Sequence, residues 1–292
     1  MNYPHLMGNT KVKWVETEWL EDNLDNGFLI FDVQPDVHDY IKEHIHNAFY
    51  FNEWLLREMQ GNDPARYIPP DAIQTIFGKL GIRRDKPILF YTGKGSYSKK
   101  GDGWGQTMAA YSLIRFGHEN VYILDGGIDK WKKEERGLTK TFPTVEESEF
   151  EIEMHEEYYI EYEEFKDIKD NDDVVVLDAR PFKYYAGPSL WSKEGHIPGA
   201  KSLQAAALMN PKNRQLLKPT EEIKSLIEER EATSNKTIIC YCGTGREATN
   251  LFLIFKWYLN YPDVRIYEGS ITEWIQRDDN PTVTGPSPYQ EE

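Results

Sequence analysis

Short runs of apolar residues alternate with amphipathic stretches along the whole chain. Four of these runs are apolar almost throughout and have the length of a strand: residues 28–33, 88–92, 175–179 and 237–241. Such strands are typical of a parallel sheet with both faces covered by helices. After the last run, apolar residues recur at spacings of three and four from Ala248 to Leu259, which predicts a helix. The pattern therefore predicts an α/β fold.

The order of these elements repeats once. Four blocks of the first half recur in the second: the strands that end in Asp32 and Asp178, the motifs at 44–48 and 196–200, the strands that lead to Thr92 and Cys242, and the strands followed by glycine at 121–127 and 264–270. A single repeat of this length predicts a duplicated domain. We expect two domains, residues 1–145 and 146–292, each a parallel sheet flanked by helices. The proline-containing, acidic segment 140–157 is expected to link them.

Cys242 stands directly after an apolar run and opens a glycine-rich loop. Gly243 and Gly245 let the backbone fold closely around the sulfur. Loop N–H groups and the start of the next helix favour a negative sulfur, and Arg246 adds a positive charge. These features predict a reactive thiolate beside an anion-binding loop. Cys240 lies inside the strand and is expected to be a buried core thiol.

Composition narrows the classes of function. The chain has 292 residues and a formal net charge of −15, which argues against nucleic acid or an anionic membrane as the main partner. It has two Cys, no indicated third metal ligand and no signal-peptide core. No segment approaches the ~20 apolar residues of a membrane helix. We expect a cytoplasmic monomer without metal or cofactor.

These motifs together resemble the rhodanese family, specifically its tandem-domain sulfurtransferases. The resemblance covers essentially the whole chain. It is carried by Leu177-Asp178-Ala179-Arg180, Gly195-His196-Ile197-Pro198-Gly199-Ala200, the loop from Cys242 to Glu247, Glu268-Gly269-Ser270 with Trp274, Phe116-Gly117-His118-Glu119-Asn120-Val121 and Leu124-Asp125-Gly126-Gly127. It implies two rhodanese-like domains, of which the second carries the catalytic Cys.

The resemblance also implies a reaction. Cys242 would take a sulfane sulfur from a small anionic donor, thiosulfate or 3-mercaptopyruvate, and hold it as a persulfide. Cyanide, a small thiol or a thioredoxin-like protein would accept that sulfur. The loop residues that would wrap the sulfur and bind the donor are Gly243, Thr244, Gly245, Arg246 and Glu247.

Further candidates have alternative interpretations. Asp178 and Arg180 lie at the same sheet edge as Cys242 and are candidate site residues. The resemblance implies that Arg180 would bind the anionic donor, because a guanidinium binds such groups in a bidentate manner; the alternative is a salt bridge with Asp178 or with an acid of the linker. Lys193 would add charge near the site or stand in solvent. His44 would join Thr244 in a proton relay, although its motif recurs in both halves and therefore favours a structural role.

The first half lacks the nucleophile, since Thr92 stands at the position of Cys242. An insert at 93–105, with Lys94, Lys99 and Lys100, follows it. We therefore expect the first half to be structural.

The loop Cys-Gly-Thr-Gly-Arg-Glu departs from the family. Gly243 and Thr244 resemble mercaptopyruvate enzymes, whereas Arg246 supplies a cation as thiosulfate enzymes do. A carboxylate at Glu247 would oppose a thiolate; the alternative is a first-turn helix residue that points away from the sulfur, which the helix dipole favours. Rhodanese-like phosphatases need an Arg six positions after the Cys, where this chain has Ala248. A non-enzymatic persulfide carrier or sulfur-relay protein stays open as the alternative.

Overall fold

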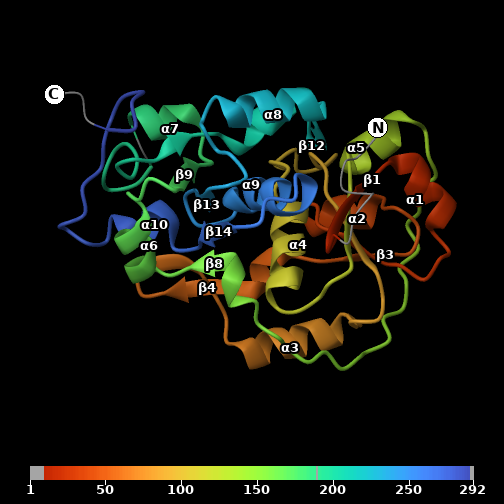
Figure 1. The fold of residues 1–292 in the computed structure, drawn as a ribbon. Helices are drawn as coiled ribbons and strands as arrows, with labels where there is room; N and C mark the ends of the chain where they lie inside the picture. Colours follow the sequence, from red (N-terminus) through yellow and green to blue (C-terminus); the bar gives the residue numbers. More distant parts are fainter. Residues whose placement is uncertain (1–9, 189, 290–292) are drawn as a thin grey trace. The chain divides into compact units, whose positions relative to one another are not determined.

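The computed structural model describes residues 10–188 and 190–289. These residues form two compact units, each built on a parallel five-stranded sheet flanked by helices (Figure 1). The α/β fold expected from the apolar runs is thus confirmed.

The sheet of the first unit has the strand order β1-β7-β6-β2-β3, with every neighbouring pair parallel. Its strands are β1 (Val12–Val15), β2 (Leu29–Asp32), β3 (Ala48–Tyr50), β6 (Ile88–Tyr91) and β7 (Val121–Leu124). Its helices are α1 (Thr17–Asn23), α2 (Val37–Lys42), the 3₁₀ turn η2 (Glu53–Leu56), α3 (Pro70–Lys79), α4 (Gly105–Arg115) and α5 (Gly127–Lys133). β2 and β6 are buried at every position, because helices cover both faces of the sheet.

The second unit repeats this sheet in the order β10-β9-β13-β14-β8, again with every neighbouring pair parallel. Its strands are β8 (Tyr159–Ile160), β9 (Val174–Asp178), β10 (Lys201–Ser202), β13 (Thr237–Tyr241) and β14 (Val264–Tyr267). Its helices are η3 (Glu156–Tyr158), α6 (Tyr162–Ile168), α7 (Phe182–Ala186), η4 (Ala205–Leu208), α8 (Thr220–Glu228), α9 (Ala248–Leu253), η5 (Ile254–Tyr258) and α10 (Ser270–Trp274). Reading β8, β14, β13, β9 and β10 against β1, β7, β6, β2 and β3 gives the same order, as a duplicated domain requires.

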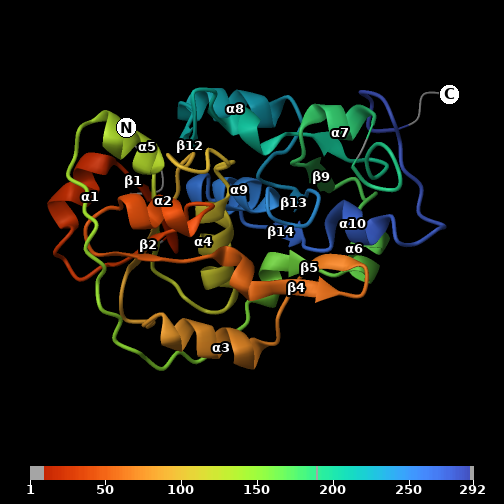
Figure 2. The ribbon, with the colours of Figure 1, turned by 180° about the vertical axis from the view of Figure 1, so that it is seen from behind.

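The helix expected from Ala248 to Leu259 has two parts. It is α-helical to Leu253 and then continues as the π-helical turn η5. Figure 2 shows α9 alongside β13 and β14 of its own sheet. This packing places the start of α9 directly beyond the end of β13.

The two units are not continuous in sequence. The hairpin β4 (Arg57–Gln60) to β5 (Asp63–Tyr67) places residues 58–66 in the second unit, and the hairpin β11 (Met209–Asn210) to β12 (Asn213–Leu217) places residues 210–217 in the first. Arg66 pairs with Glu273 of the second unit at 2.6 Å, and the Leu217 N–H donates to Asp125 of the first at 2.8 Å. The boundary between residues 145 and 146 stays a prediction.

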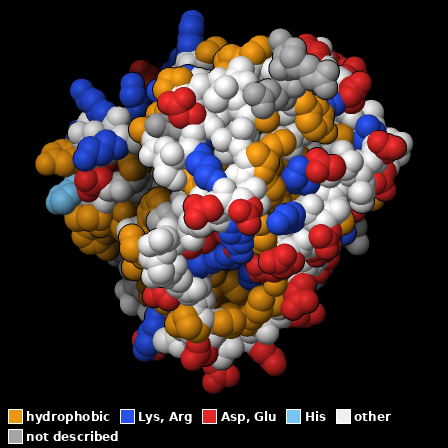
Figure 3. Space-filling view, turned by 90° about the vertical axis from the view of Figure 1, so that its left-hand side faces the viewer, with side chains coloured by type: hydrophobic (Ala, Val, Ile, Leu, Met, Phe, Trp, Pro, Cys, Tyr) orange, Lys and Arg blue, Asp and Glu red, His pale blue; other side chains and the backbone are white. Residues whose placement is uncertain are grey.

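Acidic and basic side chains are interspersed over the face drawn in Figure 3, with hydrophobic side chains between them. Among residues 10–188 and 190–289, no helix has the length and apolar composition needed to cross a membrane.

Each unit buries one carboxylate at the end of an equivalent strand. Asp178 is fully buried, and its partner is the guanidinium of Arg180. Asp32 is also fully buried, but Gln34 stands where the second unit has Arg180. Burial raises the pKa of Asp32 to about 7, although hydrogen bonds from Gln34 and Tyr91 oppose the rise. A neutral amide therefore stabilises the charged carboxylate less than an arginine would.

This difference predicts a pH dependence of stability. Between pH 4 and pH 7 the unfolded chain has lost the Asp32 proton while the folded chain keeps it. The free energy of unfolding should therefore fall by up to about 1.4 kcal/mol per pH unit from this group. Gln34→Arg should lower the folded pKa and flatten that slope, whereas the uncharged control Gln34→Met should not. Denaturant unfolding from pH 4 to pH 8 measures the slopes, and equal slopes in the parent and Gln34→Arg would contradict the prediction.

Candidate active site

The candidate nucleophile lies at the carboxyl end of a buried strand. Cys242 directly follows β13, and its side chain is buried, as is that of Cys240 inside the strand. The expectation that Cys240 is a core thiol is confirmed. Ligands of parallel sheets bind at this edge of the sheet, so the fold places Cys242 where chemistry is expected.

The connection between β14 and α10 holds the Cys242 loop in shape. The Ser270 hydroxyl accepts hydrogen bonds from the N–H groups of Cys242, at 3.1 Å, and Gly245, at 2.9 Å. It donates its own proton to the Tyr267 carbonyl at 2.9 Å. The N–H of Ile271 binds the Cys242 carbonyl at 3.1 Å. These contacts fix the direction of the backbone on both sides of the sulfur.

Trp191 covers the loop from outside and was not singled out by the sequence. Its indole N–H donates to the Thr272 hydroxyl at 2.9 Å, and that hydroxyl donates to the Gly243 carbonyl at 2.7 Å. A Cβ on Gly243 would lie 2.6 Å from the indole ring, so only glycine fits beneath it. Gly245 has a φ of +78°, which also favours glycine. The two loop glycines are thus explained by a close approach and by a backbone angle.

Three backbone N–H groups stabilise negative charge on the sulfur. Burial and the charge of Glu247 raise the pKa of Cys242 to about 11. Hydrogen bonds from the N–H groups of Ala248, Thr244 and Glu247 lower it, but by less than burial raises it. Burial and Glu247 thus favour the thiol over the thiolate, and the reactive thiolate expected from the loop pattern stays a prediction. The charge of Glu247 acts on the sulfur in the direction considered for a nearby carboxylate.

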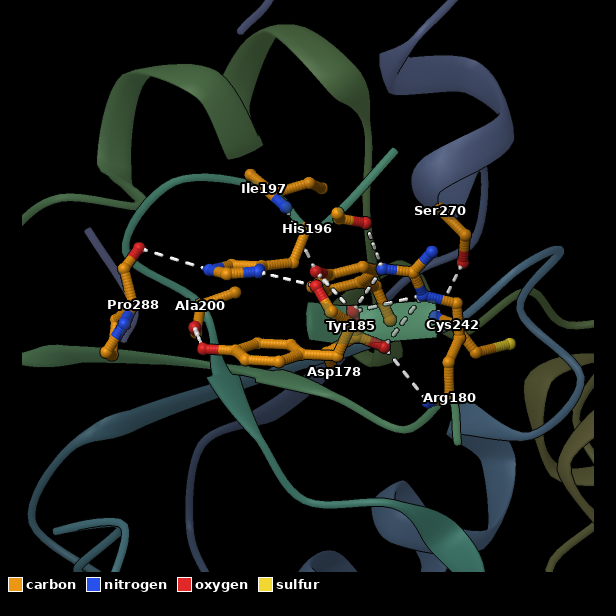
Figure 4. A network of polar contacts seen from close by, with 11 residues as sticks. Asp178, Arg180, Tyr185, His196, Ile197, Ala200, Cys242, Ser270 and Pro288 are labelled. Atoms are coloured by element: carbon orange, nitrogen blue, oxygen red, sulfur yellow. Dashed lines mark hydrogen bonds and ion pairs between the residues drawn. The ribbon is translucent and has the colours of Figure 1, made fainter. Parts of the chain in front are cut away.

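Arg180 forms a buried ion pair with Asp178 (Figure 4). Its Nε lies 3.0 Å from each carboxylate oxygen of Asp178, and its Nη2 lies 2.6 Å from Oδ2. Nη2 also donates to the Gly195 carbonyl at 2.8 Å, and Tyr241 donates to Asp178 at 2.7 Å. The salt bridge considered as an alternative role of Arg180 is therefore present. Burial lowers the pKa of Arg180, but the charge and hydrogen bonds of Asp178, together with Tyr241 and Cys242, raise it well above its ordinary value.

Other sequence candidates differ in their surroundings. Thr244, Arg246 and Glu247 are half-buried in the loop. The Lys193 ammonium donates to the carbonyls of Arg277, Asp278 and Asn280 at 2.9–3.1 Å, so it ties down the chain after α10. That contact gives Lys193 a structural partner in place of open solvent.

His44 belongs to the first unit and is fully buried. Its ring nitrogens lie 2.8 and 3.1 Å from the carbonyl oxygens of Tyr40 and Thr141. His196 repeats this arrangement with the carbonyls of Tyr185 and Pro288 at 2.9 and 3.3 Å. Because both units use the histidine alike, its contacts support the structural interpretation.

The described residues contain no group of three or more His, Cys, Asp or Glu that could hold a metal ion.

Thr92, at the Cys242 position of the first unit, is buried and donates its hydroxyl proton to the Val33 carbonyl at 2.8 Å. That hydroxyl is used in the packing of the loop.

Comparison with known proteins agrees with this geometry. The model of the rhodanese-like domain matches residues 16–134 and 161–277, and the chain therefore belongs to the rhodanese family with two such domains. A thiosulfate sulfurtransferase of Azotobacter vinelandii is 28% identical over 83% of this chain and 86% of its own. A 3-mercaptopyruvate sulfurtransferase of Escherichia coli is 26% identical over 92% of this chain and 96% of its own. The sulfur carrier protein TtuD of Thermus thermophilus is 28% identical over 89% and 92%.

Among solved structures, SseA from Escherichia coli, described as a 3-mercaptopyruvate sulfotransferase with the rhodanese fold, superposes with a TM-score of 0.77. It is 25% identical and is covered over 98% of its length, with 89% of this chain matched. The rhodanese fold is therefore shared over 89% of this chain.

The position of Glu247 predicts a measurable effect on the thiol. Glu247→Gln should lower the pKa of Cys242 from about 11 toward its ordinary value, because one of the two causes that raise it is removed. In a Cys240→Ser background, the rate of alkylation by iodoacetamide against pH reports this pKa. Glu222→Gln, on the exposed face of α8, is the control and should leave the profile unchanged. A profile that does not move in Glu247→Gln would show that its charge does not reach the sulfur.

Proposed function

We propose that this chain is a sulfurtransferase that moves a sulfane sulfur from a small anionic donor to a thiophilic acceptor through a persulfide on Cys242. The observation that carries the proposal is the Cys242 loop, in which backbone N–H groups of Thr244, Glu247 and Ala248 stabilise charge on the sulfur. Family membership and the sulfurtransferase names of the relatives support it.

The reaction has two half-reactions. In the first, the Cys242 sulfur loses its proton and attacks the outer sulfur of the donor. A new S–S bond forms on Cys242. With thiosulfate the donor S–S bond breaks and sulfite leaves with the electron pair; with 3-mercaptopyruvate the C–S bond breaks and the pyruvate enolate leaves with the electron pair and is then protonated to pyruvate. In the second, a cyanide or thiolate attacks the outer sulfur, and the electron pair returns to Cys242. The same N–H groups serve both the thiolate and the anionic persulfide.

Thiosulfate and 3-mercaptopyruvate are both proposed as donors. Each is an anion, and it approaches a sulfur that must become negative, so a fixed positive charge offsets the repulsion. Arg246 lies in the loop and is proposed to contact the donor. Arg180 is buried and its charge interacts with Cys242, and it is proposed to act through that charge.

The proposal also covers the sulfur acceptor and the cellular compartment. The acceptor is proposed to be cyanide, a small thiol or a thioredoxin-like protein. Two buried free thiols support a reducing compartment and hence a cytoplasmic location. A monomeric state is also proposed.

The name of the relative TtuD supports a second candidate, a persulfide carrier for another protein. A carrier would accept one sulfur on Cys242 and would give it up only to its partner protein. Multiple turnovers with free donor and cyanide would favour the enzyme, and a single loading without turnover would favour the carrier.

The first prediction from this proposal concerns the nucleophile. After exposure to donor, intact mass should show one added sulfur in the parent and in Cys240→Ser, but none in Cys242→Ser. Turnover of Cys242→Ser should fall below about one thousandth of the parent, because no other group can hold the sulfur. Loss of the adduct in Cys240→Ser alone would contradict the assignment.

A second prediction separates the two arginines. Arg246→Gln should raise the Michaelis constant for thiosulfate by about tenfold, equal to roughly 1.4 kcal/mol, while persulfide reduction by neutral 2-mercaptoethanol changes far less. Added salt should weaken donor use more in the parent than in this variant, since screening acts on the removed charge. Equal losses in both half-reactions would reject Arg246 as a donor-binding group.

Arg180→Gln should instead lower the free energy of unfolding by about 3–5 kcal/mol, because it leaves the buried Asp178 without its partner. Urea unfolding of the two variants measures this difference. An unfolding midpoint for Arg180→Gln that matches the parent would contradict the structural role.

A further inference from the structure

The peptide unit between Gly243 and Thr244 has both of its polar groups engaged. Its N–H group, which belongs to Thr244, donates to the Cys242 sulfur. Its carbonyl group, which belongs to Gly243, accepts from the Thr272 hydroxyl at 2.7 Å and from the Thr272 N–H at 3.3 Å. A trans peptide unit is planar, and its C=O and N–H groups point in opposite directions. Whatever holds the Gly243 carbonyl therefore also sets the direction of the Thr244 N–H.

The proton of the Thr272 hydroxyl is directed by Trp191. The indole N–H of Trp191 donates to the hydroxyl oxygen at 2.9 Å, and an indole N–H cannot accept. The single proton of the hydroxyl is thus left for the Gly243 carbonyl. Thr272 is buried, which limits competition from water for either bond. Two hydrogen bonds in series therefore connect Trp191 to the peptide unit that faces the sulfur.

The indole ring is itself held in place by its neighbours. It meets the ring of Tyr184 edge to face, with 5.8 Å between the ring centres, and its centre lies 5.1 Å from the Arg180 guanidinium carbon. Its edge lies so close to Gly243 that a Cβ there would approach it to 2.6 Å. All of these residues belong to the second unit. The donor at the start of the series thus has a fixed position relative to the Cys242 loop.

We propose that Trp191 and Thr272 are positioning residues that aim the Thr244 N–H at the sulfur of Cys242, and this proposal rests on the proposed sulfurtransferase function. That sulfur carries negative charge when it attacks the donor, and again when the acceptor takes the outer sulfur and the electron pair returns to it. An N–H group that is already aimed stabilises the charge without reorganisation. The buried Thr272 hydroxyl acts on this charge and not on the binding of the donor.

Three variants and one control isolate this effect. Thr272→Val removes the hydroxyl and keeps the shape of the side chain, whereas Thr272→Ser keeps the hydroxyl. Trp191→Phe removes the N–H donor, keeps an aromatic ring and leaves Thr272 intact. Thr237→Val is the matched control, because the Thr237 hydroxyl also donates one hydrogen bond, to Asp263 at 2.7 Å, but at the far end of β13.

The first measurement is the rate of alkylation by iodoacetamide from pH 7 to pH 10, which follows the thiolate fraction. A Cys240→Ser background leaves Cys242 as the one cysteine of the chain. The charges of Glu247 and Arg180, which interact with the sulfur, are kept in every variant. We expect alkylation about threefold slower in Thr272→Val and about twofold slower in Trp191→Phe. Thr272→Ser and Thr237→Val should match the background protein, and Trp191→Phe should add nothing in Thr272→Val.

The second measurement is the rate of persulfide formation with thiosulfate, followed by intact mass. In Thr272→Val the maximal rate should fall about tenfold, while the Michaelis constant for thiosulfate stays within twofold. Alkylation of Thr272→Val at the background rate, an equal loss in Thr237→Val, or no rescue by Thr272→Ser would overturn the proposal. Absence of a persulfide in the background protein would instead count against the sulfurtransferase function. Alkylation still tests the positioning in that case, so the two failures are distinguishable.

Discussion

The Ser270 hydroxyl joins the two segments on which the sulfur site depends. One segment leaves β13 and carries Cys242, and the other leaves β14 and begins α10. By accepting from the N–H groups of Cys242 and Gly245, the hydroxyl turns this backbone so that later N–H groups of the loop face the sulfur. Ser270 has a φ of +55°, a backbone angle that residues other than glycine rarely adopt. The surrounding hydrogen bonds compensate for that conformation.

The first unit shows what the same fold becomes without this constraint. Gly127 takes the position of Ser270 with a similar φ of +56°, and a Cβ there would lie 2.1 Å from the Thr92 carbonyl. A hydroxyl cannot fit at Gly127. The Thr92 hydroxyl instead donates to the Val33 carbonyl, which directly follows the neighbouring strand β2. The same unit has Gln34 in place of Arg180. It therefore keeps the sheet and the buried carboxylate but has lost the charge and the hydroxyl that accompany a reactive sulfur.

Two opposing effects set the state of Cys242. Burial and Glu247 favour the thiol, whereas three N–H groups favour a negative sulfur. A sulfur protonated at rest is protected from adventitious oxidation, because the thiolate is the reactive form. The persulfide is a stronger acid than the thiol, so the same N–H groups have a larger effect once sulfur has been loaded. The site is therefore suited to holding the intermediate.

The sequence alone was enough to predict the duplicated α/β fold, the place of Cys242 at the end of a buried strand and Cys240 as a core thiol; Cys242 as nucleophile stays a prediction. These depend on local patterns, since apolar runs, glycine spacing and the order of the blocks persist whatever the distant packing. It did not reveal Trp191 above Gly243, the exchanged hairpins, or the complete burial of Arg180. Those depend on which side chains meet across the fold, and that is decided by tertiary contacts between residues far apart in sequence. The same is true of the pKa of Cys242: the loop supplies N–H groups that the sequence suggests, but only the packed structure decides how much burial opposes them.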